Sequence, residues 1–374
     1  MKFTVNKNDI LDVLSKIQGL TGRKSNLAIT EAVLIRTSDS EIKLTVTDLE
    51  TGFEGIYPAS IETDGMVAIN ARKFYEIVRD FAVDEIHINE VENNWIEIGN
   101  ENVQYNIVGM NPSDFPDTPN IENIDFFKIN SKFLKSMIDK SIVISGVTDD
   151  RRAHINGVFF ETIINKNKKI VRMVSTDGSR LSSVDYIYDT DIDLPSDIGI
   201  LIPKKGLNEV SKFLTKEGIV QVGVSVKNNN FVIKKDAEII IIRLLEGEFP
   251  EYKDIINKKD VYIINLDKKL FLMMLKRMSI LSSENYKGAI FNFSDNKLII
   301  TTTNPDIGES KEEITIDFKG EPIEVAFNPR YFIETLNVID DDRISINIVN
   351  KEKPCLIEGE SNKSFLSVVM PMRI

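Results

Sequence analysis

The chain has 374 residues, of which 42% are hydrophobic and 28% are charged, and its formal net charge is -12. This length predicts two or three domains, each large enough to bury its own core, and the composition is that of a globular protein. A single cysteine, Cys355, excludes a disulfide framework within the chain and a cysteine-rich metal site. The N-terminal residues mix charge into apolar positions and no apolar run reaches bilayer length, so we expect a cytosolic protein without a membrane anchor.

The N-terminal third of the chain predicts one pattern twice: a strand, a helix and three strands. Lys2 to Asn6 alternates as a strand, Asn6 is the expected N-cap, and apolar residues of Lys7 to Gly19 recur at helical spacing. The remaining elements are strands near Ala28 to Arg36, Ile42 to Val46 and Phe53 to Tyr57, then a strand Met66 to Ile69, a helix Arg72 to Phe81 and strands near Glu85 to Asn89, Trp95 to Ile98 and Val103 to Val108.

A hairpin sequence occurs three times along the chain. In VRMVSTDGSRLSSV, Val171 to Val184, an apolar strand leads to Asp177-Gly178, which predicts a tight turn with positive φ at both residues. Thr47-Asp48 and the segment from Thr303 to Asp306 follow similar strands. The spacings from Thr47 to Thr176 and from Thr176 to Thr303 are 129 and 127 residues, which is the length of whole domains. The chain is therefore predicted to contain one domain three times.

The second and third copies begin near Phe126 and Val261. Their expected helices are Ser131 to Ser141 and Lys204 to Lys216 in the second copy, and Asp267 to Arg277, with Asn265 in the cap position, and Arg330 to Ile339 in the third. Strands Gly199 to Ile202 and Ile323 to Phe327 precede the later helix of each copy. Met110 to Pro119 and Glu246 to Tyr252 share Phe-Pro followed by an acidic residue, which is typical of extended linkers.

The six predicted helices carry positive charge on a negative chain. They contain 17 basic and 8 acidic residues, a balance of +9, so the remainder carries -21. Lysine is a good helix former on a solvated face, and that is one interpretation. The other is that the helices together line a surface that faces a polyanion.

The sequence contains no motif of a known catalytic or nucleotide-binding site. Phosphate-binding loops, dinucleotide fingerprints, zinc-protease motifs and paired cysteines are all absent, and His87 and His154 are far apart in strand-like segments. Asp149-Asp150 and Asp340-Asp341-Asp342 could hold magnesium, but solvated loops are the better interpretation. We expect no catalytic site, no cofactor and no metal.

Several segments, in order along the whole chain, resemble the bacterial DNA polymerase III beta subunit, the sliding-clamp family. They are Asn156-Gly157, Thr176 to Leu181, Glu248 to Tyr252 and the C-terminal VVMPMRI, Val368 to Ile374. The resemblance implies an α+β fold of three DNA-clamp domains, each made of two β-α-β-β-β units, over residues 1–122, 123–254 and 255–374. It also implies that two chains close head to tail into a ring with helices around the pore and sheets outside.

The implied function is to encircle duplex DNA, without sequence preference, and to tether the polymerase catalytic subunit, the clamp loader and repair proteins. The positions that the resemblance implies as DNA-facing are Arg23, Lys24, Lys73, Lys132, Lys135, Lys204, Lys205, Lys212, Lys268, Lys269, Lys276 and Arg330. The implied peptide-binding cleft consists of Arg152, Ile155, Thr176, Gly178, Ser179, Arg180, Leu181, Pro250, Ile255, Asn328, Tyr331, Val368, Met370, Pro371, Met372 and Arg373. Methionines and apolar walls suit peptide anchors.

The implied dimer interface joins the first domain of one chain to the third domain of the next. Its residues are Lys73, Tyr105, Ile107, Ile280, Leu281, Asp306 and Glu309, with Lys73 pairing with Asp306 or Glu309. Ala153, His154, Ser179 and Asp254 depart from the family pattern. Two alternatives stay open: a repeat-built peptide-binding adaptor that ignores DNA, and a metal-dependent enzyme that uses the acidic loops.

Overall fold

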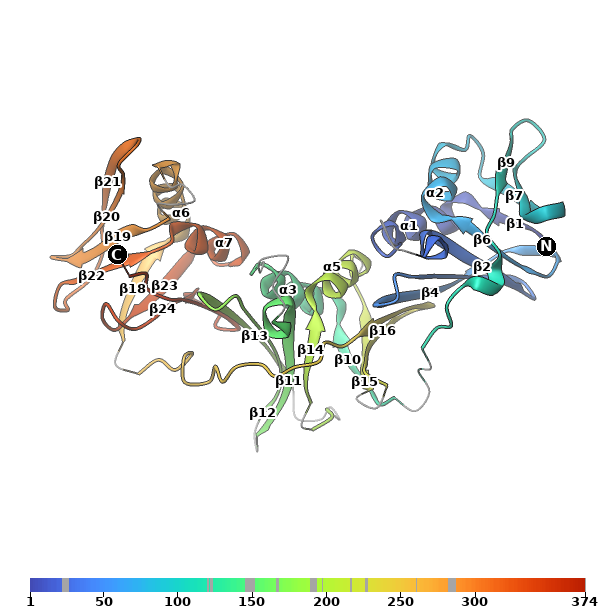
Figure 1. Cartoon of the computed structure of the whole chain (residues 1–374). Coiled ribbons are helices and arrows are strands. Elements are labelled where there is room, and N and C mark those ends of the chain that lie inside the picture. The colour runs from blue at the N-terminus through green and yellow to red at the C-terminus, as the bar shows by residue number, and fades with distance from the viewer. Residues whose placement is uncertain are drawn as a thin grey trace. The chain divides into compact units, whose positions relative to one another are not determined.

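The computed structural model describes residues 1–21, 27–119, 121, 124–144, 152–165, 168–188, 194–196, 198–215, 217–225, 228–259, 261–281 and 287–373. The chain divides into two compact units (Figure 1). Unit 1 comprises Met1–Lys135 with Lys205–Leu244, and unit 2 comprises Ser136–Lys204 with Leu245–Ile374. Among the described helices, none has both the length and the apolar content to cross a bilayer.

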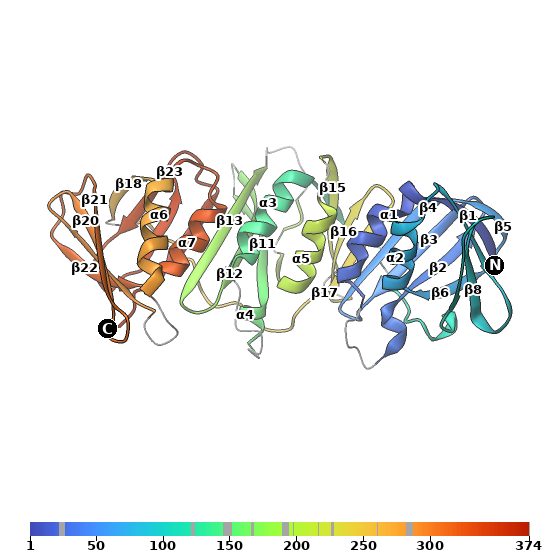
Figure 2. The same cartoon turned by 90° about the horizontal axis from the view of Figure 1, so that it is seen from above.

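Unit 1 contains two antiparallel sheets. The five-stranded sheet has the order β5-β1-β7-β8-β9 and the eight-stranded sheet the order β10-β15-β16-β17-β4-β3-β2-β6. The strands are β1 (Lys2–Asn6), β2 (Ala32–Ser38), β3 (Glu41–Thr47), β4 (Thr51–Pro58), β5 (Ser60–Thr63), β6 (Met66–Asn70), β7 (Glu85–Glu90), β8 (Trp95–Gly99), β9 (Gln104–Val108), β10 (Phe126–Asn130), β15 (Ile219–Ser225), β16 (Asn230–Lys235) and β17 (Glu238–Arg243). Helices α1 (Lys7–Lys16) and α2 (Ala71–Asp80) pack side by side (Figure 2).

Unit 2 has the same kind of architecture. Its eight-stranded sheet has the order β14-β11-β12-β13-β25-β24-β23-β18 and its four-stranded sheet the order β21-β20-β19-β22. The strands are β11 (Gly157–Asn165), β12 (Lys168–Thr176), β13 (Arg180–Tyr188), β14 (Gly199–Pro203), β18 (Tyr262–Asp267), β19 (Ala289–Ser294), β20 (Lys297–Asn304), β21 (Gly308–Thr315), β22 (Ile323–Phe327), β23 (Arg343–Ile348), β24 (Cys355–Gly359) and β25 (Phe365–Val369). The helices are α4 (Ala153–Asn156), α6 (Lys268–Met278) and α7 (Pro329–Val338), while α3 (Ser131–Ile142) and α5 (Lys204–Phe213) each contain a point where the chain passes from one unit to the other.

The predicted pattern of six β-α-β-β-β units is confirmed. β1-α1-β2-β3-β4 and β6-α2-β7-β8-β9 form the first pair, and the same order recurs from β10 to β17 and from β18 to β25. The structure adds the short strand β5 and the one-turn helix α4, which the sequence did not predict. The domain boundaries at 122/123 and 254/255 stay predictions.

The predicted N-cap residue of the first helix is confirmed, whereas the one predicted for the first helix of the third repeat is not. The Asn6 side chain accepts a hydrogen bond from the backbone of Asn8, as predicted for an N-cap. The prediction for Asn265 was wrong, because the N-cap of α6 is Asp267, whose carboxylate accepts from Leu270 N at 2.8 Å. Asn265 lies two residues earlier in β18, where its side chain accepts from the Ser345 hydroxyl.

Two predicted element boundaries were also displaced. The strand expected from Ala28 begins only at Ala32, because Ala28–Glu31 forms a 3-10 turn that the Thr30 hydroxyl ties back to Leu27 O. The helix expected as far as Lys216 ends at Phe213.

Backbone pairing joins consecutive repeats into single sheets. β17, from the second repeat, pairs antiparallel with β4 of the first, and β25 of the third repeat pairs antiparallel with β13 of the second. A ladder of this kind satisfies main-chain donors and acceptors whatever the side chains are. Each unit therefore has a continuous sheet that spans a repeat junction.

Aromatic packing fills the core below α6 and α7. The Phe332 ring stacks on Phe291 with centroids 5.1 Å apart and meets Phe271 and Phe327 edge to face at 6.2 Å and 5.3 Å. All four rings are fully buried. Their burial and mutual geometry hold the two helices against the strands of the third repeat.

Lysines at helix starts hold neighbouring backbone in place. Lys7 begins α1 and donates to the carbonyl of Phe81, the residue after α2, at 2.6 Å; Lys268 begins α6 and donates to Ile339, the residue after α7, at 2.8 Å. Lys204 begins α5 and donates to Ile155 O at 2.6 Å. Burial lowers the pKa of Lys204 to about 8, and this shift is moderated by the nearby Asp177 carboxylate.

The burial of Lys204 predicts a rise in stability at alkaline pH. Its folded pKa of about 8 lies below the ordinary value of 10.5, so between these two values the unfolded chain binds more protons and the free energy of unfolding rises with pH. We expect the melting temperature of the wild type to rise, relative to that of Lys204→Met, as the pH increases from about 8 to 10.5.

Lys205→Met is the matched control for this comparison. Burial acts to lower the pKa of Lys205, but the hydrogen bond to Asp48 and the charges of Asp48, Glu50 and Glu209 together outweigh burial, and the pKa is raised. Lys205→Met should therefore show the same alkaline rise as the wild type. Parallel pH profiles for the wild type and Lys204→Met would contradict the assignment.

Candidate functional site

The turn between β12 and β13 is organised by two side chains. The Thr176 hydroxyl donates to Arg180 O at 2.7 Å and accepts from Gly178 N at 3.0 Å, while the Asp177 carboxylate accepts from the backbone of Ser179 and Arg180, both at 3.0 Å. Gly178 has a φ of 88°, but Asp177 is not in the left-handed region, so the prediction of positive φ at both residues was wrong for Asp177. The aspartate caps the turn through its side chain instead.

Arg180 joins this turn to helix α7. Its side chain is 5% exposed, its Nε lies 3.0 Å from the Asp177 carboxylate, and it donates a second hydrogen bond to Glu334. The guanidinium also lies over the Tyr331 ring, 4.3 Å from the centroid. Paired with two carboxylates and one ring, the buried cation fixes the turn relative to α7.

The C-terminal residues continue the sheet beside this turn. Val368 lies opposite Leu181 in the β13–β25 ladder, Met370 N donates to Ser179 O at 2.9 Å, and Met372 N donates to Ala326 O at 2.8 Å. The side chains of Met370 and Met372 are 38% and 39% exposed. Main-chain bonds therefore hold two half-exposed thioethers at the end of the ladder.

An apolar cluster lies under the paired strands. Its buried members are Val174, Leu181, Tyr252, Leu356 and Val368, and Phe159, Phe249, Ile256 and Leu366 pack against them. The linker is tied into this cluster through Tyr252, whose hydroxyl donates to Glu161 and accepts from Arg172 at 3.4 Å. Burial raises the pKa of the Tyr252 hydroxyl, and the hydrogen bond to Asp185 raises that of Arg172.

The structure thus brings much of the predicted cleft together. Thr176, Gly178, Ser179, Arg180, Leu181, Tyr331, Val368, Met370 and Met372 are linked by the contacts above. Ile155 and Asn328 are buried, and the Asn328 side chain caps α7. Arg152, Pro250, Ile255 and Arg373 are exposed and Pro371 is partly exposed.

Val174, Tyr252 and Leu356 belong to the apolar cluster but were not predicted. For Val174 and Leu356, the alternation of β12 and β24 would have placed them on the apolar face, but only once the strand pairing was known. Tyr252 belongs to the Glu248 to Tyr252 segment that resembles the family, but it is not among the residues predicted to line the cleft.

The predicted DNA-facing cations fall into two groups. Most of those described have partners: Lys73 with Glu76 at 2.9 Å, Lys135 with the Ser211 hydroxyl at 2.6 Å, Lys205 with Asp48 at 2.5 Å, Lys212 with Glu209 at 2.6 Å, Lys132 with Glu217 at 4.0 Å, and Lys204 and Lys268 with backbone carbonyls. Lys269, Lys276 and Arg330 are exposed and form no side-chain hydrogen bond or ion pair with the described residues. Arg23 and Lys24 lie outside the described residues.

The predicted interface residues lie on edge strands, in turns, in the 3-10 helix Ser279–Leu281 and, for Lys73, on α2. In unit 1, Tyr105 and Ile107 are on β9, an edge strand whose side chains are mostly exposed. In unit 2, Ile280 is 74% exposed, and Asn304 connects the Leu281 carbonyl to the turn that carries Asp306. Asp306 and Glu309 are exposed. Lys73, the third predicted charge of this interface, is bonded to Glu76 of its own helix.

The carboxylates of Asp340 and Asp341, which were considered as possible metal ligands, are bonded to other groups of the protein. Asp340 pairs with Lys140 at 2.7 Å, and Asp341 accepts from the backbone of Ser361 and Asn362 at 2.6 Å and 3.0 Å. No group of three or more metal-ligating side chains occurs among the described residues. Asp149 and Asp150 lie outside that part of the chain.

Comparisons with known proteins cover all three repeats. Residues 1–119, 128–251 and 253–373 match the N-terminal, central and C-terminal domains of the DNA polymerase III beta subunit. Proteins named "Beta sliding clamp" from Buchnera aphidicola and Chlamydia pneumoniae are 29% and 26% identical, over 100% of this chain and 100% and 99% of their own.

Solved structures show the same likeness. A chain described as a DNA polymerase III beta subunit from Eubacterium rectale is 29% identical with a TM-score of 0.90, and the beta subunit from Pseudomonas aeruginosa is 25% identical with a TM-score of 0.92. Both alignments cover 100% of each chain. With its three repeats matched in order and over their full length, the chain belongs to the DNA polymerase III beta-subunit family.

Proposed function

We propose that this protein is a DNA sliding clamp, which encircles duplex DNA as a ring of two chains and tethers the replicative polymerase for processive synthesis. The observation that carries the proposal is the match of three successive clamp domains over the whole chain. We place the domain boundaries at residues 1–122, 123–254 and 255–374. The protein acts as a topological tether and has no catalytic step of its own.

Edge strands support closure into a ring. β9 and β21 are terminal strands of their sheets in the described part of each unit, and Val108 and Ile307 beside them are 62% and 64% exposed. Unpaired edges with apolar neighbours are templates for pairing with another chain. A head-to-tail contact of β9 on one chain with β21 on the next would use different surfaces on each partner and close after two chains.

The exposed cations support a weak, sequence-independent contact with phosphates. Lys269, Lys276 and Arg330 are the described members of the predicted set with the most freely available charge. Lys204 and Lys268 instead donate to backbone carbonyls, so we assign them a positioning role at the helix starts. Phosphate contacts of this kind are salt-dependent and carry no base information.

The DNA contact predicts a specific salt dependence. Replacing Lys269, Lys276 and Arg330 together by alanine should reduce the slope of log affinity against log salt by up to about 3 per chain, because each phosphate contact contributes about 0.9. The measurement is retention on nicked circular and on linear DNA across a salt series. The matched control replaces the exposed Lys319, Lys351 and Lys353, which lie outside helices, by alanine.

A comparison of circular with linear DNA distinguishes a ring around the duplex from ordinary binding to its surface. The wild type should stay on circular DNA and be lost after linearisation, and sedimentation should show a dimer of the 42.4 kDa chain. Equal retention on both DNA forms, or a monomer at micromolar concentration, would favour the alternative of a peptide-binding adaptor that ignores DNA.

We further propose that the cleft beside β13 and β25 receives short peptide segments of the polymerase, the clamp loader and repair proteins. Leu181 and Val368 supply an apolar floor, and the half-exposed Met370 and Met372 adapt to different side chains. Arg180 holds the turn in place from the side of α7. The exposed Ser179 and Pro250 lie on segments that border the cleft.

Deletion of Met370 to Ile374 should abolish binding of the polymerase catalytic subunit while the protein remains a dimer on circular DNA. Met372→Ala tests the same site without removing main-chain bonds and should weaken binding about tenfold. Met273→Ala is the control, since Met273 is 45% exposed on α6. Binding to the immobilised polymerase subunit is measured by surface plasmon resonance, and unchanged affinity after the deletion would contradict the site.

A further inference from the structure

The junction between the first and second repeats has the same backbone hydrogen bonds as the junction beside the proposed cleft. The Thr47 hydroxyl accepts from Leu49 N at 3.0 Å, as the Thr176 hydroxyl does from Gly178 N. The Asp48 carboxylate accepts from Glu50 N and Thr51 N at 3.1 Å and 2.7 Å, as the Asp177 carboxylate does from the two equivalent residues.

Strand pairing at the two junctions is also in the same register. Thr51 pairs with Ile242 and Gly52 with Ile241, as Arg180 pairs with Val369 and Leu181 with Val368. Arg243 N donates to Glu50 O at 2.8 Å, and Met370 N donates to Ser179 O at 2.9 Å. A linker that contains Phe-Pro and then an acidic residue comes after each of the first two repeats: Met110 to Pro119 after the first and Glu246 to Tyr252 after the second. The two sites therefore share one framework.

Several side chains differ between these frameworks, among them Glu50 for Ser179 and Thr51 for Arg180, and three further differences shape the first junction. Gly52 replaces Leu181, which removes a wall; Leu49 replaces Gly178; and Arg243 replaces Met370. Leu49 is held at a φ of 76° with its side chain 49% exposed. A leucine in this conformation is strained, and such strain is concentrated at binding sites and turns.

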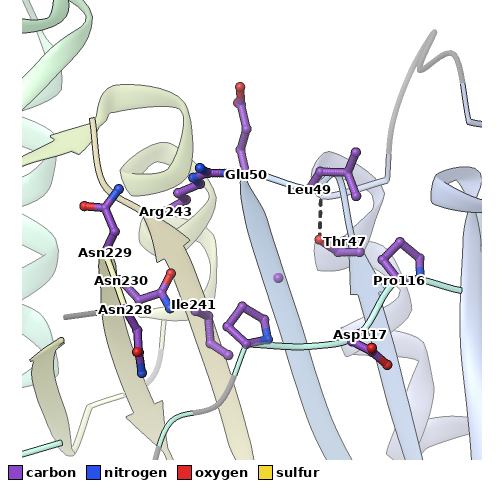
Figure 3. Close-up of a pocket in the computed structure, with 12 residues that line it drawn as sticks. Thr47, Leu49, Glu50, Pro116, Asp117, Asn228, Asn229, Asn230, Ile241 and Arg243 are labelled. Atoms are coloured by element: carbon purple, nitrogen blue, oxygen red, sulfur yellow. Dashed lines mark hydrogen bonds between the residues drawn. The ribbon is translucent and has the colours of Figure 1, made fainter. Parts of the chain in front are cut away.

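A cavity of about 270 Å³ lies at this junction, and Gly52 is one of the residues that line it (Figure 3). It is lined by Thr47, Leu49, Glu50, Gly52, Pro116, Asp117, Pro119, Asn228, Asn229, Asn230, Ile241 and Arg243. Figure 3 shows the asparagines and Arg243 on one side and Pro116 and Asp117, from the linker, on the other. Pockets for drug-sized ligands measure about 300–1,000 Å³, so this cavity fits one or two side chains rather than a cofactor.

The cavity is lined by both apolar and charged side chains. Leu49, Pro116 and Ile241 provide apolar surface, and Arg243 is exposed with no side-chain hydrogen bond or ion pair to the described residues. Of the nearby carboxylates, Asp48 pairs with Lys205 at 2.5 Å and Glu50 lies 3.7 Å from the same ammonium. Asp117 belongs to the opposite side, so the positive charge of Arg243 is available to an anionic group.

We propose that this junction is a second peptide-binding pocket, which accepts an extended segment of a partner protein with a leucine or phenylalanine next to an acidic residue. The apolar side chain occupies the space over Gly52 and Ile241, and the carboxylate pairs with Arg243. The pocket is a variant of the proposed cleft with a different preference, so one protein can bind two kinds of segment. It depends on the repeat framework and not on ring closure.

Two substitutions test the pocket in the full-length protein. Gly52→Leu places a leucine at the position equivalent to Leu181. A Cβ at Gly52 meets no atom closer than 3.9 Å, so we expect the backbone to accept the substitution and the side chain to occupy the cavity. Arg243→Met restores the residue found at Met370. The probe is a pool of acetylated hexapeptides in which Leu or Phe precedes Asp or Glu, with a matched pool that contains Asn or Gln instead, and binding is measured by ligand-observed NMR and titration.

The acidic pool should bind the wild type more tightly than the amide pool, by about threefold to fivefold. Gly52→Leu should weaken binding of both pools more than about tenfold, while Arg243→Met should remove only the preference for acid. Gly52→Ala, with a far-UV spectrum as a check on folding, replaces Gly52→Leu if the latter does not fold.

Met372→Ala separates this inference from the proposed cleft, because it should leave the preference for the acidic pool over the amide pool unchanged. Binding that survives Gly52→Leu but is lost in Met372→Ala would overturn the second pocket while leaving the cleft intact. Absence of any acidic hexapeptide binding to the wild type would overturn it as well.

Discussion

The main-chain ladder between repeats is the constraint on which the other features of this structure depend. β4 with β17 and β13 with β25 pair through backbone groups in the same register. Because such hydrogen bonds do not require particular side chains, the framework tolerates divergence at the surface. Leucine and methionine at one junction correspond to glycine and arginine at the other. A repeated fold can therefore present two chemically different sites without a change in its backbone.

Positive charge on the helices has two physical roles that net charge alone does not separate. Lys7, Lys204 and Lys268 donate to carbonyls at helix ends, where unsatisfied acceptors favour a cation. Lys269, Lys276 and Arg330 remain exposed and form no side-chain bond within the described part of the chain. The structural lysines connect the start of one helix to the end of another, and the exposed cations are left to act on a ligand.

Arg180 shows how a buried charge can support a binding surface that it does not itself form. Two carboxylates and the Tyr331 ring surround its guanidinium, so its burial is compensated. The turn that carries Ser179, and through it the main chain of Met370, is thereby fixed relative to α7. The methionine side chains stay free to adapt while the backbone below them is rigid.

The sequence by itself determined the six β-α-β-β-β units, the Asn6 cap and the Thr-Asp turns, because periodicity, caps and turns depend on residues a few positions apart. It also carried the segments that resemble the clamp family. Only the tertiary structure decided which strands pair across repeats and that Asp267 rather than Asn265 caps α6. It also decided that Tyr252 anchors the linker and which lysine side chains form hydrogen bonds or ion pairs within the protein. These outcomes depend on contacts between residues far apart in the chain, whose geometry no local pattern encodes. The cavity at Gly52 belongs to the same class, since an absent side chain becomes a pocket only when the strands and linker around it are in place.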